Sequence, residues 1–229
     1  MAGLALDKLR FSRATSLRLL SAIVSAAIFG MLAAPLTHAP YWLSAFALAF
    51  IFGFFFVGGT GYRILIAVAF QDASRKASAS WSGATAASAL AALCAAILLI
   101  GRDEASILVL AAYAVAINTA YIPVKFACLE AGCCHAHRRD PVLIRNHDLR
   151  HVEIALTTAV AAASLASIWM DAFGVAAVLG TGGHLVVRVL SRWSRDRLPG
   201  SSLDEELKGQ ELLPLALLFF ASILVNTLL

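Results

Sequence analysis

The chain has 229 residues, of which 60% are hydrophobic and only 14% are charged, and its formal net charge is +4. A soluble domain of this size cannot cover its surface with so few polar groups, so the composition excludes a soluble enzyme and indicates a polytopic membrane protein. The apolar runs are long and must satisfy their own backbone hydrogen bonds, which predicts an all-α fold rather than a barrel of strands.

The hydropathy pattern predicts about seven transmembrane helices in a single domain that covers residues 1–229. The first apolar run is too long for a cleavable signal peptide and lacks a small-residue cleavage site. The second run is long enough to tilt, or to break at the glycine-rich segment 58–61. The predicted spans are roughly 16–34, 41–70, 82–100, 105–128, 151–170, 173–192 and 211–228.

Lysine and arginine are distributed unevenly between the two sides of the predicted membrane. With the N-terminus inside, the outer loops carry only Arg102, so the positive-inside rule predicts an inner N-terminus and an outer C-terminus. The basic residues lie in short loops without interleaved aromatic residues, so the sequence predicts no nucleic-acid partner. The inner basic residues are Lys8, Arg10, Arg13, Arg18, Arg75, Lys76, Arg138, Arg139, Arg145, Arg150, Arg195, Arg197 and Lys208.

A hydrophilic loop rich in cysteine and histidine follows the fourth predicted span and contains Cys128, Cys133, Cys134, His135 and His137. A thiol beside basic groups becomes nucleophilic, which favours a catalytic or substrate-facing role. Three thiols and two imidazoles also suffice for a tetrahedral metal site, although the spacing is not a standard zinc spacing. A third interpretation is that the cysteines are small apolar residues at a tight helix exit. The sequence leaves these three interpretations open.

Ionisable residues also fall inside or at the ends of the predicted spans: Arg63, Lys125, Glu153, His184 and Arg188. An unpaired charge is costly in hydrocarbon, so such residues pair, line a hydrated cavity or extend to the interface. Glu153 also suits the N-terminus of a helix, where a negative charge is favourable. Gathered into one site, these side chains form a cationic pocket that suits a phosphate group, with Glu153 orienting an arginine.

The segment Lys125–His135 resembles the cysteine-pair signature of the bacterial prolipoprotein diacylglyceryl transferases. Four further segments resemble parts of that family in the same order along the chain. They are Gly61–Leu65 at the end of the second helix, Leu149–Glu153 at the start of a later helix, His184–Arg188, and Gly209–Pro214 at the start of the last helix. The expected number of helices, seven, agrees with the family as well.

Members of this family transfer a diacylglyceryl group from phosphatidylglycerol to a cysteine thiol of an exported lipoprotein precursor. The resemblance implies a multi-pass transferase of the bacterial inner membrane, with a phospholipid and a cysteine-bearing lipoprotein precursor as partners and with no cofactor and no metal. The implied catalytic residues are Glu153, Arg188, Cys133 and His135, and the implied substrate-binding residues are Arg63, Lys125, His184 and Gly132.

Several positions depart from the family pattern. The signature arginine is Lys125, and Ser191 and Arg192 stand where a glutamate is expected after Arg188. Lipoprotein modification takes place on the outer face, whereas the basic residues place the Cys/His loop inside. Two alternatives therefore stay open: a metal- or haem-binding membrane protein that uses the Cys/His loop, and a non-catalytic lipid-binding relative.

Overall fold

The computed structural model describes residues 16–17, 20–33, 81–99, 104–130, 148–194 and 211–228. All the regular structure in these ranges is helical and none of it is strand, which confirms the predicted all-α class for this part of the chain. The helices are an N-terminal helix Leu20–Ala33, α3 (Trp81–Leu98), α4 (Ala105–Glu130), α5 (Leu149–Trp169), α6 (Phe173–Trp193) and α8 (Leu212–Leu228).

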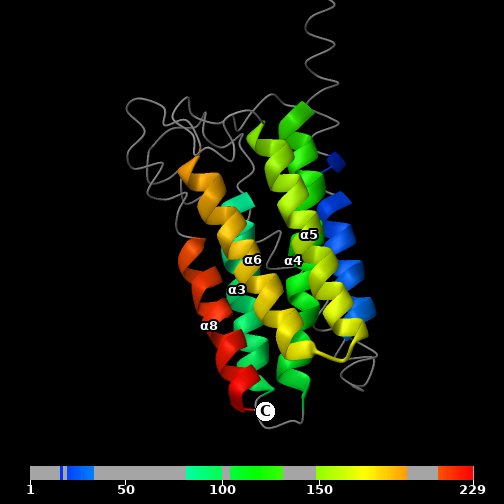
Figure 1. The fold of residues 1–229 in the computed structure, drawn as a ribbon, viewed down its shortest axis with the longest axis vertical. Coiled ribbons are helices and arrows are strands. Elements are labelled where there is room, and N and C mark those ends of the chain that lie inside the picture. Colours follow the sequence, from blue (N-terminus) through cyan, green and yellow to red (C-terminus); the bar gives the residue numbers. More distant parts are fainter. Residues whose placement is uncertain are drawn as a thin grey trace, which may run out of the picture.

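These helices stand side by side as a bundle, and consecutive described helices from α3 to α6 run in opposite directions (Figure 1). α4 is the central helix: 83% of its most apolar stretch is buried inside the protein, against 33% for α5 and 39% for α6. A helix that is apolar on every side is buried, because no face of it prefers water. The other described helices of the bundle pack around α4, and α5 and α6 present much of their apolar surface outward.

α4, α5 and α6 are long and apolar enough to cross a membrane. A helix of 21 residues, such as α5 or α6, rises about 31 Å, which matches the roughly 30 Å hydrocarbon core of a bilayer. The N-terminal helix, α3 and α8 are apolar but shorter within the described residues. The predicted span 41–70 lies outside the described residues, so the total of seven spans stays a prediction.

Small residues allow α4, α5 and α6 to approach one another closely. A Cβ atom added to Gly180 on α6 would lie 2.5 Å from the Cβ of Ala114 on α4 and 2.8 Å from the Oγ of Ser164 on α5. One turn later, a Cβ on Gly183 would lie 2.6 Å from a methyl group of Val160 on α5. Helix contacts built on glycine and alanine are typical of membrane proteins, because they bring backbones close enough for extensive packing.

α5 and α6 are joined by a very short turn in which Asp171 adopts a left-handed conformation with φ 55°. Aspartate tolerates this region better than most residues, because its short polar side chain can bond locally. The turn and the contacts at Gly180 and Gly183 fix α5 and α6 as an antiparallel pair. Polar residues near the start of α5 therefore lie opposite residues near the end of α6.

Candidate functional site

Charged and polar side chains from α4, α5, α6 and the start of α8 meet around Tyr121 of α4. The Tyr121 hydroxyl donates a hydrogen bond to Glu153 Oε1 of α5 at 3.1 Å and accepts one from Arg188 Nη1 of α6. Lys125 Nζ lies 4.9 Å and Arg188 Cζ lies 5.1 Å from the centre of the Tyr121 ring. Both distances fall within the range of favourable contact between a cation and an aromatic ring, so Tyr121 joins the two basic residues.

Each basic side chain of this cluster is also paired with a carboxylate. Lys125 Nζ lies 2.5 Å from Glu153 Oε2, and Arg188 Nε donates to Glu211 Oε1 at 2.9 Å, with Nη2 donating to the same oxygen. All four charged residues are at most 4% exposed. A buried charge left without its partner is strongly destabilising, so each pair depends on both of its members.

The structure brings together four of the residues singled out from the sequence: Lys125, Glu153, His184 and Arg188. They come from three different helices, α4, α5 and α6. The other four singled-out residues, Arg63, Gly132, Cys133 and His135, lie outside the described residues.

His184 lies one turn before Arg188 on α6, and its imidazole is fully buried. Its Nδ1 atom is 3.1 Å from Oδ1 of Asn118 on α4, and its ring meets the Tyr121 ring edge-on with centroids 5.3 Å apart. Asn118 Nδ2 in turn donates to the backbone oxygens of Ala114 at 2.7 Å and Gly180 at 2.9 Å. Asn118 thus connects His184 to the backbones of both α4 and α6.

Three members of the cluster did not stand out from the sequence: Asn118, Tyr121 and Glu211. Asn118 and Tyr121 precede Lys125 by seven and four residues, and this spacing places all three on one face of α4. That spacing is the signal that points to them, but uncharged polar residues hardly change the hydropathy of a long apolar run. Glu211 directly precedes α8 and falls inside the segment Gly209–Pro214. A charged residue at the start of an apolar run is the sequence signal that points to it.

The first turn of α5 is fixed by a side-chain cap. Asp148 accepts a hydrogen bond from the backbone nitrogen of Arg150 at 2.9 Å and another from Arg150 Nε at 2.8 Å. Hydrogen bonding to Arg150 lowers the pKa of the Asp148 carboxyl from 3.8 to about 2. Arg150 Nη1 also donates to the backbone oxygen of Cys128 at 3.3 Å. The start of α5 is thereby tied to the last turns of α4, close to Glu153.

The cluster lies a short distance inside one end of the bundle. Glu153 is four residues from the start of α5, and Lys125 and Arg188 are each five residues from the ends of α4 and α6. At 1.5 Å per residue, these positions are about 6–8 Å inside the helix ends. Trp193 at this end and Trp169 at the other are 79% and 80% exposed, as expected for aromatic residues at the two membrane interfaces. The ion pairs therefore lie near one end of the bundle, about one turn inside the helix ends.

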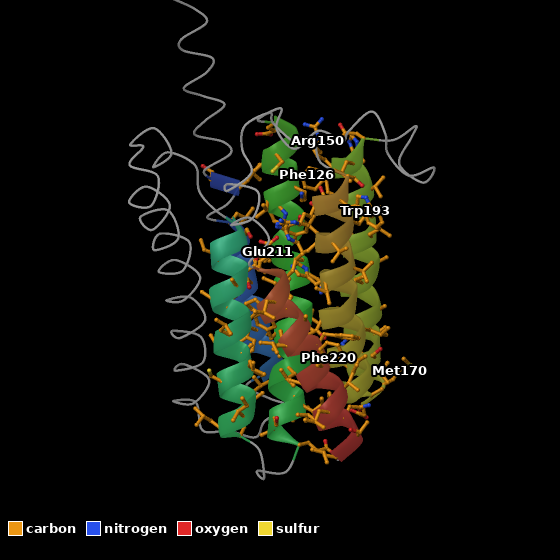
Figure 2. The ribbon with its side chains drawn as sticks, turned by 90° about the vertical axis from the view of Figure 1, so that its left-hand side faces the viewer. Phe126, Arg150, Met170, Trp193, Glu211 and Phe220 are labelled. Atoms are coloured by element: carbon orange, nitrogen blue, oxygen red, sulfur yellow. The ribbon has the colours of Figure 1, made fainter. Side chains whose placement is uncertain are left out.

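Figure 2 shows Glu211, Arg150, Phe126 and Trp193 toward the end of the bundle that carries the cluster, with Met170 near the opposite end. Phe126 is 47% exposed on α4, directly next to the buried Lys125 in the sequence. One end of the bundle thus combines an outward apolar surface with an inward cluster of charges. This combination suits a ligand that has both acyl chains and a charged headgroup.

Most of the candidate metal ligands of the Cys/His loop lie outside the described residues. They are Cys133, Cys134, His135 and His137. Cys128, the described member of that set, is a buried residue near the end of α4. Within the described part of the chain, no group of three or more His, Cys, Asp or Glu side chains is arranged to hold a metal ion. No observation among these residues favours the metal- or haem-binding alternative.

No family model, no curated protein and no solved structure matches the chain. The function is therefore argued from the chemistry of the cluster. Its two cations and two carboxylates balance, so these four residues contribute no net charge to the cluster. An anion that enters finds an ammonium and a guanidinium group already held in place, which lowers the cost of reorganising the site around it.

Proposed function

We propose that this protein is a membrane transferase resembling the prolipoprotein diacylglyceryl transferases. In this proposal it moves a diacylglyceryl or related lipid group from an anionic phospholipid similar to phosphatidylglycerol to a thiol acceptor, in the inner membrane of a bacterium. The observation that carries the proposal is the meeting of Lys125, Glu153 and Arg188 around Tyr121, near one end of the bundle.

Binding of the lipid depends on the two cations. Arg188 suits a phosphate because its planar guanidinium group donates two parallel hydrogen bonds, and Lys125 adds a second positive charge. Glu153 and Glu211 hold these side chains in place. When the lipid binds, a phosphate oxygen takes over some of the ionic contacts that the carboxylates make. The acyl chains stay in the bilayer beside the exposed apolar faces of α5 and α6.

The transfer step explains why two cations are needed. The thiolate sulfur forms a bond to a glycerol carbon, and the bond from that carbon to the phosphate oxygen breaks with its electron pair leaving on the oxygen. The thiol proton passes to solvent water before the attack, and the departing glycerol phosphate gains one negative charge. Positive side chains fixed beside the phosphate stabilise this charge as it develops, which lowers the barrier.

The remaining roles follow from the family resemblance alone. Glu153 and Arg188 act as catalytic residues, together with Cys133 and His135 of the Cys/His loop. Arg63 and Gly132 join Lys125 and His184 in binding the substrate. These assignments apply the family pattern to this chain residue by residue.

The test is transfer by the purified protein in vesicles that contain phosphatidylglycerol labelled in its diacylglycerol part, with a cysteine-bearing peptide as acceptor. We expect Arg188→Gln and Lys125→Gln each to lower transfer at least about a hundredfold, since removing one electrostatic contact to a developing charge has an effect of this size. The matched control is Arg192→Gln, an exposed arginine one turn after Arg188 on the same helix, which should leave transfer unchanged.

Undiminished transfer in both variants contradicts the assignment of these residues. Labelled lipid that binds stoichiometrically to the wild-type protein, but is never transferred to any thiol peptide, favours the non-catalytic lipid-binding alternative instead.

A further inference from the structure

One polar atom of the cluster lacks the hydrogen bond that its burial demands. His184 Nε2 is fully buried and has no hydrogen-bond partner among the described residues. Buried polar groups are nearly always paired, because leaving one unpaired costs about 1–3 kcal/mol. A buried nitrogen without a partner beside a cluster of charges therefore indicates a place for a ligand atom.

The surrounding hydrogen bonds determine what kind of atom fits there. Both amide hydrogens of Asn118 are directed to the backbone oxygens of Ala114 and Gly180, so its Oδ1 atom faces His184. Because an amide oxygen can only accept, His184 Nδ1 must carry the proton of the neutral ring. His184 Nε2 is then a bare acceptor, and the missing partner is a hydrogen-bond donor.

The facing helix carries a second buried polar atom without a described partner. The Oγ1 atom of Thr157 on α5 is also buried and unpartnered among the described residues. The antiparallel contacts of Gly180 with Ser164 and of Gly183 with Val160 place Thr157 within about one turn of the level of His184. A hydroxyl group bound here can donate to His184 Nε2 and accept from Thr157 Oγ1.

The charges of the cluster distinguish between possible donors. Lys125 and Arg188 both lie against the Tyr121 ring, whose edge meets the ring of His184. An ammonium headgroup would compete with Lys125 and Arg188 for Glu153 and Glu211, whereas a neutral hydroxyl group would not. His184 lies four residues deeper than Arg188 on α6, about 6 Å, a separation that the carbon chain of a small polyol can span from a phosphate bound at Arg188.

We infer that His184 Nε2 determines headgroup specificity by accepting a hydrogen bond from a hydroxyl group of the bound phospholipid, with Thr157 as the second partner of that hydroxyl. The inference rests on the proposed function, since it places the phosphate of the same lipid at Lys125 and Arg188. It adds the selection of polyol headgroups over headgroups of equal charge that lack a hydroxyl group.

The experiment compares two lipids of equal charge, one with hydroxyl groups on its headgroup and one without. Phosphatidylglycerol and phosphatidylethanol carry the same phosphodiester charge, but the ethanol headgroup has no hydroxyl. Each competes with labelled phosphatidylglycerol for binding to the purified wild-type protein, with no thiol acceptor present. We expect phosphatidylglycerol to bind roughly tenfold more tightly, as one hydrogen bond to a buried acceptor provides.

Two variants test whether His184 Nε2 and Thr157 Oγ1 cause the preference for phosphatidylglycerol. His184→Phe retains a ring beside Tyr121 and removes the acceptor, so phosphatidylglycerol should fall to the affinity of phosphatidylethanol. Thr157→Val keeps the shape of the side chain and removes its hydroxyl, and should reduce the preference by a few-fold. Thermal unfolding of both variants reports whether the bundle is intact, and the wild-type comparison stands without them.

Equal affinities of the two lipids for the wild-type protein overturn this inference and leave the proposed function in place. A preference that persists in folded His184→Phe also overturns it, because another group then forms the hydrogen bond with the headgroup hydroxyl. A preference that arises only when a thiol acceptor is added assigns Nε2 to the acceptor instead. No binding of either lipid contradicts both the inference and the proposed function.

Discussion

At the scale of single residues, each buried charge depends on its paired side chain, because solvent does not reach it. Lys125 touches Glu153 and the ring of Tyr121, and all three side chains are almost completely buried. Losing one member of a buried pair costs about 3–5 kcal/mol, because the other is left as an isolated charge. Substitutions that keep the charge are therefore the informative ones at this site.

Lys125→Arg should retain transfer to within about threefold and keep the bundle folded. The guanidinium group preserves the ion pair with Glu153 and can donate two hydrogen bonds where the ammonium group is a point charge. The family that the sequence resembles carries arginine at the corresponding signature position, which is consistent with this expectation. Transfer and thermal unfolding are measured beside Lys125→Gln. Equal loss in Lys125→Arg and Lys125→Gln means that the length and shape of lysine, and not its charge, are needed.

At the scale of helices, the start of α5 depends on one acidic residue. Asp148 caps the helix and binds the side chain of Arg150, which reaches across to the backbone oxygen of Cys128 on α4. Replacing a good N-cap residue by alanine costs about 1 kcal/mol. The cap holds the first turn of α5, and Glu153 lies one turn further along the same helix.

The charge of Asp148 gives this contact a defined pH dependence. Its pKa is depressed from 3.8 to about 2 by Arg150, so its contribution to the free energy of unfolding is fully present above about pH 4 and is lost as the pH falls toward 2. Asp148→Asn retains a capping oxygen but has no charge to lose. We expect the wild-type protein to be the more stable of the two at pH 5, with the difference shrinking toward pH 2.

Reversible unfolding in mixed micelles at several pH values measures this difference. Asp148→Ala, which lacks both the cap and the charge, should be the least stable of the three proteins at pH 5. A constant difference between the wild-type protein and Asp148→Asn across the pH range contradicts the assigned ion pair with Arg150.

At the scale of the whole molecule, hydropathy and length were enough to predict the all-α class and the approximate ends of several helices. The spans predicted at 105–128, 151–170 and 173–192 agree with α4, α5 and α6 to within two residues at each end. The reason is physical, since a bilayer imposes both the length and the apolar character of a crossing helix. Charged residues inside such runs, like Arg188, are conspicuous for the same reason.

The partners of those charges could not be predicted in the same way. Glu211 pairs with Arg188 across 23 positions, and Tyr121 with Arg188 across 67, because helix packing rather than sequence distance brings them together. Asn118 orients His184 through a contact that depends on the close approach at Gly180. Composition signals that helices pack closely but not which faces meet. The pairing of side chains therefore requires the three-dimensional arrangement.

The bundle also has an orientation, which the charges at its two ends indicate. The end that carries the cluster is where the segments 131–147 and 195–210 join the described helices, and each segment contains three lysine or arginine residues. At the opposite end, the described helix ends and turn carry the acidic residues Glu104 and Asp171. By the positive-inside rule, we expect the cluster to face the cytoplasm. In that orientation the proposed acceptor thiol comes from the cytoplasm, unlike the exported lipoproteins that the resembled family modifies.

Labelling of single cysteines from each side of the membrane decides this orientation. In a background without native cysteines, Met170→Cys and Trp193→Cys place thiols at opposite ends of the bundle, where the native side chains are 70% and 79% exposed (Figure 2). A membrane-impermeant maleimide should label Met170→Cys in intact cells and Trp193→Cys only in inverted vesicles. The reverse pattern places the ion pairs near the outer headgroups. An exported cysteine then becomes the natural acceptor, because it emerges on the same side as the bound phosphate.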